Sequence, residues 1–292
     1  MTQQVPLDAS NIAGQPQDDG TVEIAPDIAY LRLAIVNVVL FGTPGQRHWV
    51  LVDTGIPTMA GRIRRAAAER FGEGVAPAAI ILTHGHFDHV GTLETLAREW
   101  DAPVYAHPLE LPYLNGTASY PPPDPSVGGG LLALSSPLFP RSPVDVGERL
   151  HALPEDGSVP EMTGWRWVHT PGHSVGQVSL WREADRSMIV GDAFVTTAQE
   201  SAYAAVTQEP ELHGPPKYFT HDWQAARDSV LRLAALEPEL VVTGHGRAMH
   251  GVAMREALRT LAREFDQVAV PQDGRFVEHP QRAEDGSAYR PA

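Results

Sequence analysis

Residues 81–91, ILTHGHFDHVG, place His84, His86, Asp88 and His89 within six positions, directly after an apolar run that is typical of a buried strand. The whole chain holds only 13 histidines in 292 residues, so this concentration calls for an explanation. A single histidine in a polar loop would usually be an ordinary surface residue. Three histidines and an aspartate at a strand end predict a metal site, provided that other parts of the chain supply further ligands.

Three later segments share this arrangement, because each holds a histidine or an aspartate just after a strand-like apolar run. They are HTPGHS with His173, VGDAF with Asp192 and TGHGR with His245. A strand end is a rigid support, and the loop that leaves it can aim side chains into a shared cleft. Five imidazoles and two carboxylates suit zinc or a similar divalent ion, but they are too many for one tetrahedral ion. The sequence therefore predicts two ions that share a bridging carboxylate.

The overall composition narrows the classes of function and of site. The chain is 42% hydrophobic and 20% charged, as in an ordinary soluble globular protein. Its formal net charge of -14 argues against a nucleic-acid partner, because binding to phosphates requires a basic face. Cysteine is absent, which excludes disulfides, thiolate zinc ligands and a cysteine nucleophile. Any metal ion must therefore be held by His, Asp or Glu.

The sequence shows no targeting or membrane segment. Residues 1–20 lack a basic region followed by an apolar run, so we expect no signal peptide. The longest apolar candidate, residues 30–42, contains Arg32 and Asn37 and is too short to cross a bilayer. We therefore expect a cytoplasmic protein without a membrane partner.

Strand-like and helix-like segments alternate along the chain and predict a layered α/β fold. We expect a flexible N-terminal arm over residues 1–20, a single domain over residues 21–270 and an irregular tail over residues 271–292. The clearest helix, DWQAARDSVLRLAALEP over residues 222–238, has apolar residues at helical spacing and a proline at its end.

Residues 108–160 interrupt this alternation with segments that are rich in Pro, Gly and Ser, such as YPPPDPSVGGG. This insertion is either a variable surface loop or a lid that forms a pocket wall, since long loops often carry function. As a wall it would present five large side chains, and the same side chains could instead form packing clusters or a homodimer contact. They are Tyr113, Leu114, Tyr120, Leu138 and Phe139.

The motif THGHFDH resembles the H-x-H-x-D-H signature of the metallo-β-lactamase superfamily, and the later histidines and aspartate arrive in that family's order. The resemblance covers roughly residues 25–250 and implies a four-layer αβ/βα sandwich. It also implies a ligand set for each of two ions. The first ion would be held by His84, His86 and His173, the second by Asp88, His89 and His245, and both by the bridging Asp192.

Asp53, in the segment VDTG, matches an early aspartate of the same family. The resemblance implies that its carboxylate accepts a hydrogen bond from a ligand imidazole and fixes the orientation of that ring. The alternative is an ordinary turn aspartate before Thr54 and Gly55.

Two divalent ions lower the pKa of a bridging water, so hydroxide forms at neutral pH and can attack a carbonyl or a phosphoryl centre. We therefore predict a dinuclear metal-dependent hydrolase. Zinc is the expected metal, and the same ligands also accept iron, manganese or nickel. Asp88 would be both a ligand and the group that orients the nucleophile. Lactonases of the family use a tyrosine to hold the carbonyl oxygen, and Tyr203 and Tyr218 are the candidates here, although each could be an ordinary packed or surface aromatic.

A small-molecule ester or lactone is the expected substrate. A glyoxalase II-like thioester hydrolase and a β-lactamase are the alternatives, and the general acid is left unassigned. An alternative of a different class is a metal-binding interaction domain whose activity is incidental. Six further histidines lack motif partners and are expected to be structural. They are His107, His151, His169, His213, His221 and His250. For His221, in the segment FTHDW, a pocket role is the alternative.

Overall fold

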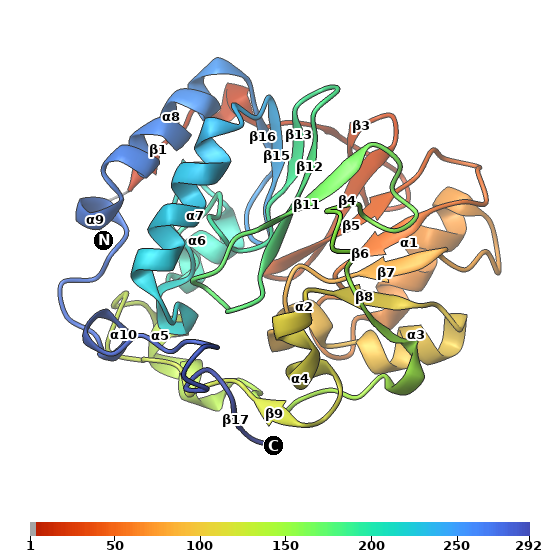
Figure 1. Cartoon of the computed structure of the whole chain (residues 1–292). Coiled ribbons are helices and arrows are strands. Elements are labelled where there is room, and N and C mark those ends of the chain that lie inside the picture. Colours follow the sequence, from red (N-terminus) through yellow and green to blue (C-terminus); the bar gives the residue numbers. More distant parts are fainter. Residues whose placement is uncertain (1–3) are drawn as a thin grey trace.

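The computed structural model describes residues 4–292, and two mixed β-sheets lie face to face at its centre (Figure 1). Within this range the larger sheet has the strand order β10-β8-β7-β6-β5-β4-β3-β2, and the smaller has the order β11-β12-β13-β15-β16. The strands of the larger sheet are β2 Gln15–Pro16, β3 Val22–Ala25, β4 Ile28–Leu33, β5 Val36–Phe41, β6 Val50–Val52, β7 Ala79–Ile81, β8 Val104–Ala106 and β10 Leu150–Ala152. Those of the smaller sheet are β11 Trp165–His169, β12 Val178–Arg182, β13 Ser187–Ile189, β15 Leu240–Val242 and β16 Met249–His250.

Helices cover the outer faces of the two sheets (Figure 1). The longer ones are α1 Ala60–Phe71, α3 Leu93–Trp100, α7 Trp223–Ala235 and α8 Gly251–Arg263. The shorter ones are α2 Phe87–Val90, α4 Leu111–Leu114, α5 Leu131–Ser135, α6 Ala202–Thr207, α9 Phe265–Val268 and α10 Arg275–Glu278. Short 3₁₀ turns are η1 Ala9–Asn11, η2 Pro108–Glu110, η3 Ser136–Leu138, η4 Gly147–Arg149 and η5 Lys217–Phe219. In the described residues, no helix combines the length and the apolar character needed to cross a bilayer.

Strand β6 shows why both faces of the larger sheet are covered. Its three residues are all buried, and successive side chains of a strand point to opposite faces. Val50 and Val52 therefore pack in the core between the two sheets, together with Val242 of β15. Leu51 points the other way and packs in the core that contains Ile63 of α1.

The smaller sheet buries its outer face in the same way. Val241 of β15 belongs to a core formed with Val230 and Leu233 of α7 and Leu258 of α8. Helix α7 begins after Asp222, whose side chain accepts a hydrogen bond from the Ala225 N–H. The order of layers is thus helix, sheet, sheet, helix, which confirms the predicted four-layer αβ/βα sandwich.

The insertion over residues 108–160 contains more regular structure than its composition predicts. Strand β10 extends the larger sheet, with Leu150 opposite Val104 of β8 in a parallel pair. Strand β9 Ala118–Ser119 pairs with β17 Arg290–Pro291 of the C-terminal tail. These pairs are made by backbone groups, which proline- and glycine-rich sequences do not signal.

The segments at both ends of the chain pack on the domain. Strand β1 Val5–Pro6, in the predicted N-terminal arm, pairs with β14 Glu211–Leu212, and β2 pairs with β3. In the tail, the Tyr289 hydroxyl donates a hydrogen bond to the Leu109 carbonyl oxygen at 3.0 Å. The tail therefore lies against the start of the insertion.

Candidate metal centre

The polar segments that follow strand-like runs in the sequence leave the ends of two parallel strand pairs. Strands β6 and β7 run parallel, as do β13 and β15. The carboxyl ends of parallel strands meet at one edge of a sheet, so the loops that follow them lie close together. These loops carry Asp53, His84, Asp192 and His245, and helix α2 adds Asp88 and His89.

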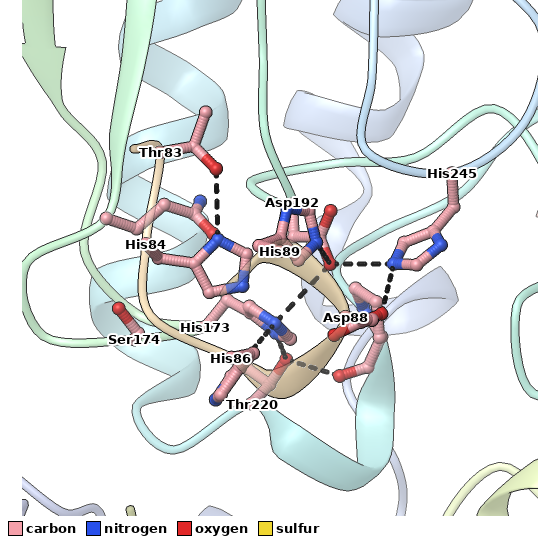
Figure 2. A network of polar contacts seen from close by, with 12 residues as sticks. Thr83, His84, His86, Asp88, His89, His173, Ser174, Asp192, Thr220 and His245 are labelled. Atoms are coloured by element: carbon pink, nitrogen blue, oxygen red, sulfur yellow. Dashed lines mark hydrogen bonds and ion pairs between the residues drawn. The ribbon is translucent and has the colours of Figure 1, made fainter. Parts of the chain in front are cut away.

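All seven predicted metal ligands lie in one buried cluster, and none is more than 8% exposed (Figure 2). Three overlapping groups of side chains have ligand atoms within 4.8 Å of one another. The groups are His84, His86 and His173; His84, His89 and Asp192; and Asp88, His89 and His245. Segments that are up to 161 positions apart in the sequence, from 84 to 245, thus meet at one point.

Asp192 lies in the middle of this cluster (Figure 2). Its Oδ2 is 3.0 Å from Nε2 of His245, 3.5 Å from Nε2 of His173 and 3.6 Å from Nε2 of His89. Asp88 approaches the same nitrogen of His245, with 3.4 Å between Asp88 Oδ2 and His245 Nε2. Asp192 Oδ2 therefore faces His173 of the first predicted triad and His245 of the second.

Two of the predicted ligand imidazoles are oriented by acceptors behind them. Nδ1 of His89 donates to Asp53 Oδ2 at 2.8 Å, and the same carboxylate accepts from Thr83 N at 2.8 Å. Nδ1 of His245 donates to the Ile35 carbonyl oxygen at 2.6 Å. In the neutral ring that binds a metal ion, an N–H at Nδ1 leaves the lone pair on Nε2, which is the atom that faces the cluster. Asp53 is thus more than a turn residue, because it contacts the ring of a predicted ligand, His89.

The other three imidazoles form the second half of the cluster. Nδ1 of His84 lies 3.1 Å from Thr83 Oγ1, and Nδ1 of His173 lies 3.3 Å from Thr220 Oγ1. His86 instead directs Nδ1 toward Nε2 of His173, at 2.9 Å. Ring nitrogens of three histidines thus converge from two separate loops.

Several atoms of the cluster have no protein partner. Among the described residues, Nε2 of His84, His86 and His89 and Oδ1 of Asp192 are buried without a hydrogen bond. A buried polar atom without a partner costs about 1–3 kcal/mol. Imidazole and carboxylate groups are suitable donors for a divalent transition metal. The side chains present here therefore fit divalent metal binding.

Burial and charge act in opposite directions on the pKa values of the cluster. Burial lowers the pKa of His84 well below its ordinary value, and the neighbouring His89 lowers it further. Burial would lower the pKa of His89 too, but the carboxylates of Asp192 and Asp53 outweigh it and raise that pKa well above the ordinary value. For Asp192, the surrounding His245 and His89 overcome burial and hold its pKa well below the usual range. Asp192 is therefore an ionised carboxylate among imidazoles.

Gly244 leaves no room for a side chain beside Asp192. A Cβ atom at this position would lie 2.0 Å from Asp192 Oδ1 and 2.8 Å from Cε1 of His89. We expect Gly244→Ala to displace the carboxylate and to weaken metal binding about 10–100-fold, measured by competition with a chromogenic chelator. Gly61→Ala is the control, because a Cβ there meets open space. Equal affinities in the two variants would contradict the expectation.

The two candidate tyrosines lie in different environments. Tyr203 is on α6 and is 69% exposed, unlike the buried ligands. Tyr218 is on η5 and is 4% exposed. Burial raises the pKa of Tyr218 well above its ordinary value, and the nearby carboxylates, Asp88 first among them, raise it further. The structure therefore buries Tyr218 within the electrostatic influence of Asp88 and leaves Tyr203 exposed on α6.

The insertion supplies part of the wall beside the cluster. The Tyr120 ring lies 4.3 Å from the His86 ring, and Phe139 lies 5.2 Å from Phe87 of α2. Phe219 of η5 approaches His86 at 4.8 Å. Of the five side chains predicted to line a pocket, Tyr113, Leu114 and Tyr120 are buried, Phe139 is partly buried and Leu138 is 85% exposed.

His221 lies behind this wall. Its ring is 6.2 Å from the His86 ring and 4.7 Å from Phe276 of α10, and its side chain is buried. Two other residues near the ligand loops, Glu110 and Thr220, are absent from our sequence predictions. Both are single polar residues outside any motif, so no local pattern marks them.

The family model of the metallo-beta-lactamase superfamily matches residues 31–245. The chain belongs to this superfamily. Among curated relatives, the probable metallo-hydrolase YflN of Bacillus subtilis (strain 168) is 47% identical over 247 residues, which cover 84% of this chain and 94% of YflN. The probable metallo-hydrolase YybB of the same strain is 32% identical over 196 residues, or 67% of this chain and 74% of YybB.

Solved structures show the same superfamily fold. A B3 metallo-beta-lactamase with an active site glutamic acid superposes with a TM-score of 0.58 at 18% identity, over 91% of this chain and 96% of that one. A metallo-beta-lactamase family protein from Thermus thermophilus has a TM-score of 0.58 at 21% identity, over 84% and 81% of the two chains. The family match and the similarity to YflN identify the chain as a metal-dependent hydrolase.

Proposed function

We propose that this hydrolase is dinuclear and cleaves a small-molecule ester or lactone. The observation that carries the proposal is the position of Asp192, whose Oδ2 faces Nε2 of His173 at 3.5 Å and Nε2 of His245 at 3.0 Å. These two histidines belong to different triads. A carboxylate between two sets of imidazoles is the arrangement that a bridging ligand requires.

One ion would be held by His84, His86 and His173, the other by Asp88, His89 and His245, and both by Asp192. Zinc is the metal we propose, and iron, manganese and nickel are accepted by the same donor types. When bound, such a pair of ions lowers the pKa of a bound water toward neutrality and polarises a carbonyl oxygen. The remaining roles belong to side chains of the chain itself.

In this proposal Asp88 would orient the attacking water and accept its proton. It is the most exposed of the seven candidate ligands, at 8%, and its Oδ2 is 3.4 Å from His245 Nε2. A carboxylate within reach of the reacting water is the usual form of such a base. Tyr218 is our candidate donor to the carbonyl oxygen of the substrate, because its phenol is buried and Asp88 is the first of the nearby carboxylates that raise its pKa. We assign no such role to Tyr203, because it is exposed.

The surroundings of the cluster support a carbonyl substrate over a phosphate ester. Phe87, Phe139 and Phe219 pack together beside His86 and give the site an apolar wall. The chain carries a formal net charge of -14, which disfavours a polyanionic substrate. The similarity to the probable metallo-hydrolase YflN supports catalysis over an interaction domain.

The test is a panel of lactones, esters, thioesters, β-lactams and phosphodiesters, assayed with the zinc-loaded protein. We expect kcat/KM for a lactone or an ester to exceed that for the other classes at least about tenfold. Chelation should abolish turnover, and added zinc should restore it. A higher kcat/KM for thioesters or β-lactams would overturn the proposed substrate class. Zinc binding without turnover of any substrate would favour the interaction domain.

A further inference from the structure

Glu110 is a fully buried carboxylate that accepts hydrogen bonds from two ligand-bearing loops. It is the last residue of η2 and is 0% exposed. Its Oε2 accepts from the Gly85 N–H at 2.9 Å. Its Oε1 accepts from the Gly176 N–H at 2.8 Å and from Ser174 Oγ at 2.5 Å. One side chain thus joins segments that are 91 positions apart, from 85 to 176.

The positions of these donors in the sequence are informative. Gly85 lies between His84 and His86, and Ser174 directly follows His173. Glu110 therefore joins the two backbones that carry one triad of imidazoles. The other triad is oriented by different acceptors, since Asp53 holds His89 and the Ile35 carbonyl holds His245.

Tyr120 extends the contact from the backbone to a ligand ring. Its hydroxyl donates to Glu110 Oε2 and accepts from the Gly85 N–H at 2.9 Å. Its ring lies 4.3 Å from the ring of His86 and stacks on Tyr113 at 3.7 Å. The bond to Glu110 therefore also fixes an aromatic ring against His86.

Close packing leaves Glu110 little freedom to move. A Cβ atom at Gly176 would lie 2.8 Å from Cγ of Glu110 and 3.0 Å from its Oε1. The backbone of the His173 loop thus touches the side chain of Glu110 directly. Four donors surround the two carboxylate oxygens, and a carboxylate is the group that can accept from all of them.

We propose that Glu110 is a positioning residue that sets the separation of His84 and His86 from His173, and thereby the affinity of the metal ion between them. The inference rests on the ligand assignment in the proposed function. A metal ion requires its ligands at fixed distances, so loops that are already held in place bind it more tightly. Glu110 touches no ligand atom and acts through the two loops.

Glu110→Gln keeps the size of the side chain but replaces one acceptor oxygen with an NH₂ group that must face an N–H or O–H donor. Zinc affinities are measured by competition with a chromogenic chelator, and zinc per chain by elemental analysis. We expect one ion to bind about 10–100-fold more weakly and the other to stay within about threefold of the unmodified chain.

Two backgrounds identify the affected ion. His245→Ala removes a ligand of the second ion. In this background, Glu110→Gln should weaken the first ion as much as it does in the otherwise unmodified chain. In His86→Ala, which removes a ligand of the first ion, Glu110→Gln should have little further effect. Glu94→Gln is the matched control, because Glu94 accepts a backbone hydrogen bond from Asp145 N at 3.0 Å in an exposed position. It should leave both affinities unchanged.

Tyr120→Phe is the second variant, for use if Glu110→Gln does not fold. It removes only the hydroxyl and should weaken the same ion by a smaller factor. Unchanged affinities in folded Glu110→Gln, or equal losses for both ions, would overturn the role of Glu110. An unmodified chain that binds a single ion or none would instead overturn the dinuclear site of the proposed function.

Discussion

Asp88→Asn should lower kcat/KM for the best substrate by about 10²–10⁴-fold, which is the range for loss of a general base. The substitution keeps the shape of the side chain but removes the negative charge that orients water and accepts its proton. Asp88 lies beside His245, with 3.4 Å between Oδ2 and Nε2, so the variant should also weaken the ion that they share. Steady-state kinetics at saturating zinc, with zinc per chain measured in parallel, separate these two effects.

Asp185→Asn is the control for loss of a carboxylate. Asp185 lies in the turn between β12 and β13 and accepts hydrogen bonds from the Arg182 guanidinium, at the opposite end of β12 from the cluster. Its replacement should leave kcat/KM unchanged. A fully zinc-loaded Asp88→Asn protein with normal kcat/KM would refute a catalytic role for Asp88.

Removal of the metal should lower the melting temperature by about 10 °C. Binding to the folded state alone stabilises it by about 4 kcal/mol when the free ion is at 1,000 times its Kd. For a chain of this size, about 1 kcal/mol corresponds to about 2–4 °C. The ligands come from loops between positions 84 and 245, so the ions would join both halves of the sandwich. Differential scanning calorimetry with and without a strong chelator measures the shift.

Asp192→Ala provides the comparison for this experiment. Asp192 is the carboxylate that faces both triads, so its loss should weaken both ions and leave little stabilisation for the chelator to remove. A chelator that denatures the protein directly would lower the melting temperature of both proteins equally. An unchanged melting temperature of the unmodified chain after complete metal removal would contradict the prediction.

The seven ligand candidates could be identified from the sequence because their signals are local. His84, His86, Asp88 and His89 stand together after one strand, and each later ligand has its own short motif after another apolar run. The layered α/β class follows from the periodic alternation of strands and helices. The family resemblance then predicted the four-layer sandwich, which the two sheets and their covering helices confirm.

Other features were decided only by contacts between distant parts of the chain. A proline-rich insertion gave no sign that β10 would extend the larger sheet, since that pair is made by backbone groups. The sequence does not distinguish Tyr203 from Tyr218, and only the packing of the chain exposes the first and buries the second.

Glu110 shows most directly what local sequence patterns do not predict. In HPLELPYL it is an isolated acidic residue, and its four donors come from positions 85, 120, 174 and 176. Local motifs therefore determined which groups this protein has for metal binding and where in the chain they stand. The tertiary structure decided what holds those groups in place, because each such contact joins single residues that share no pattern in the sequence.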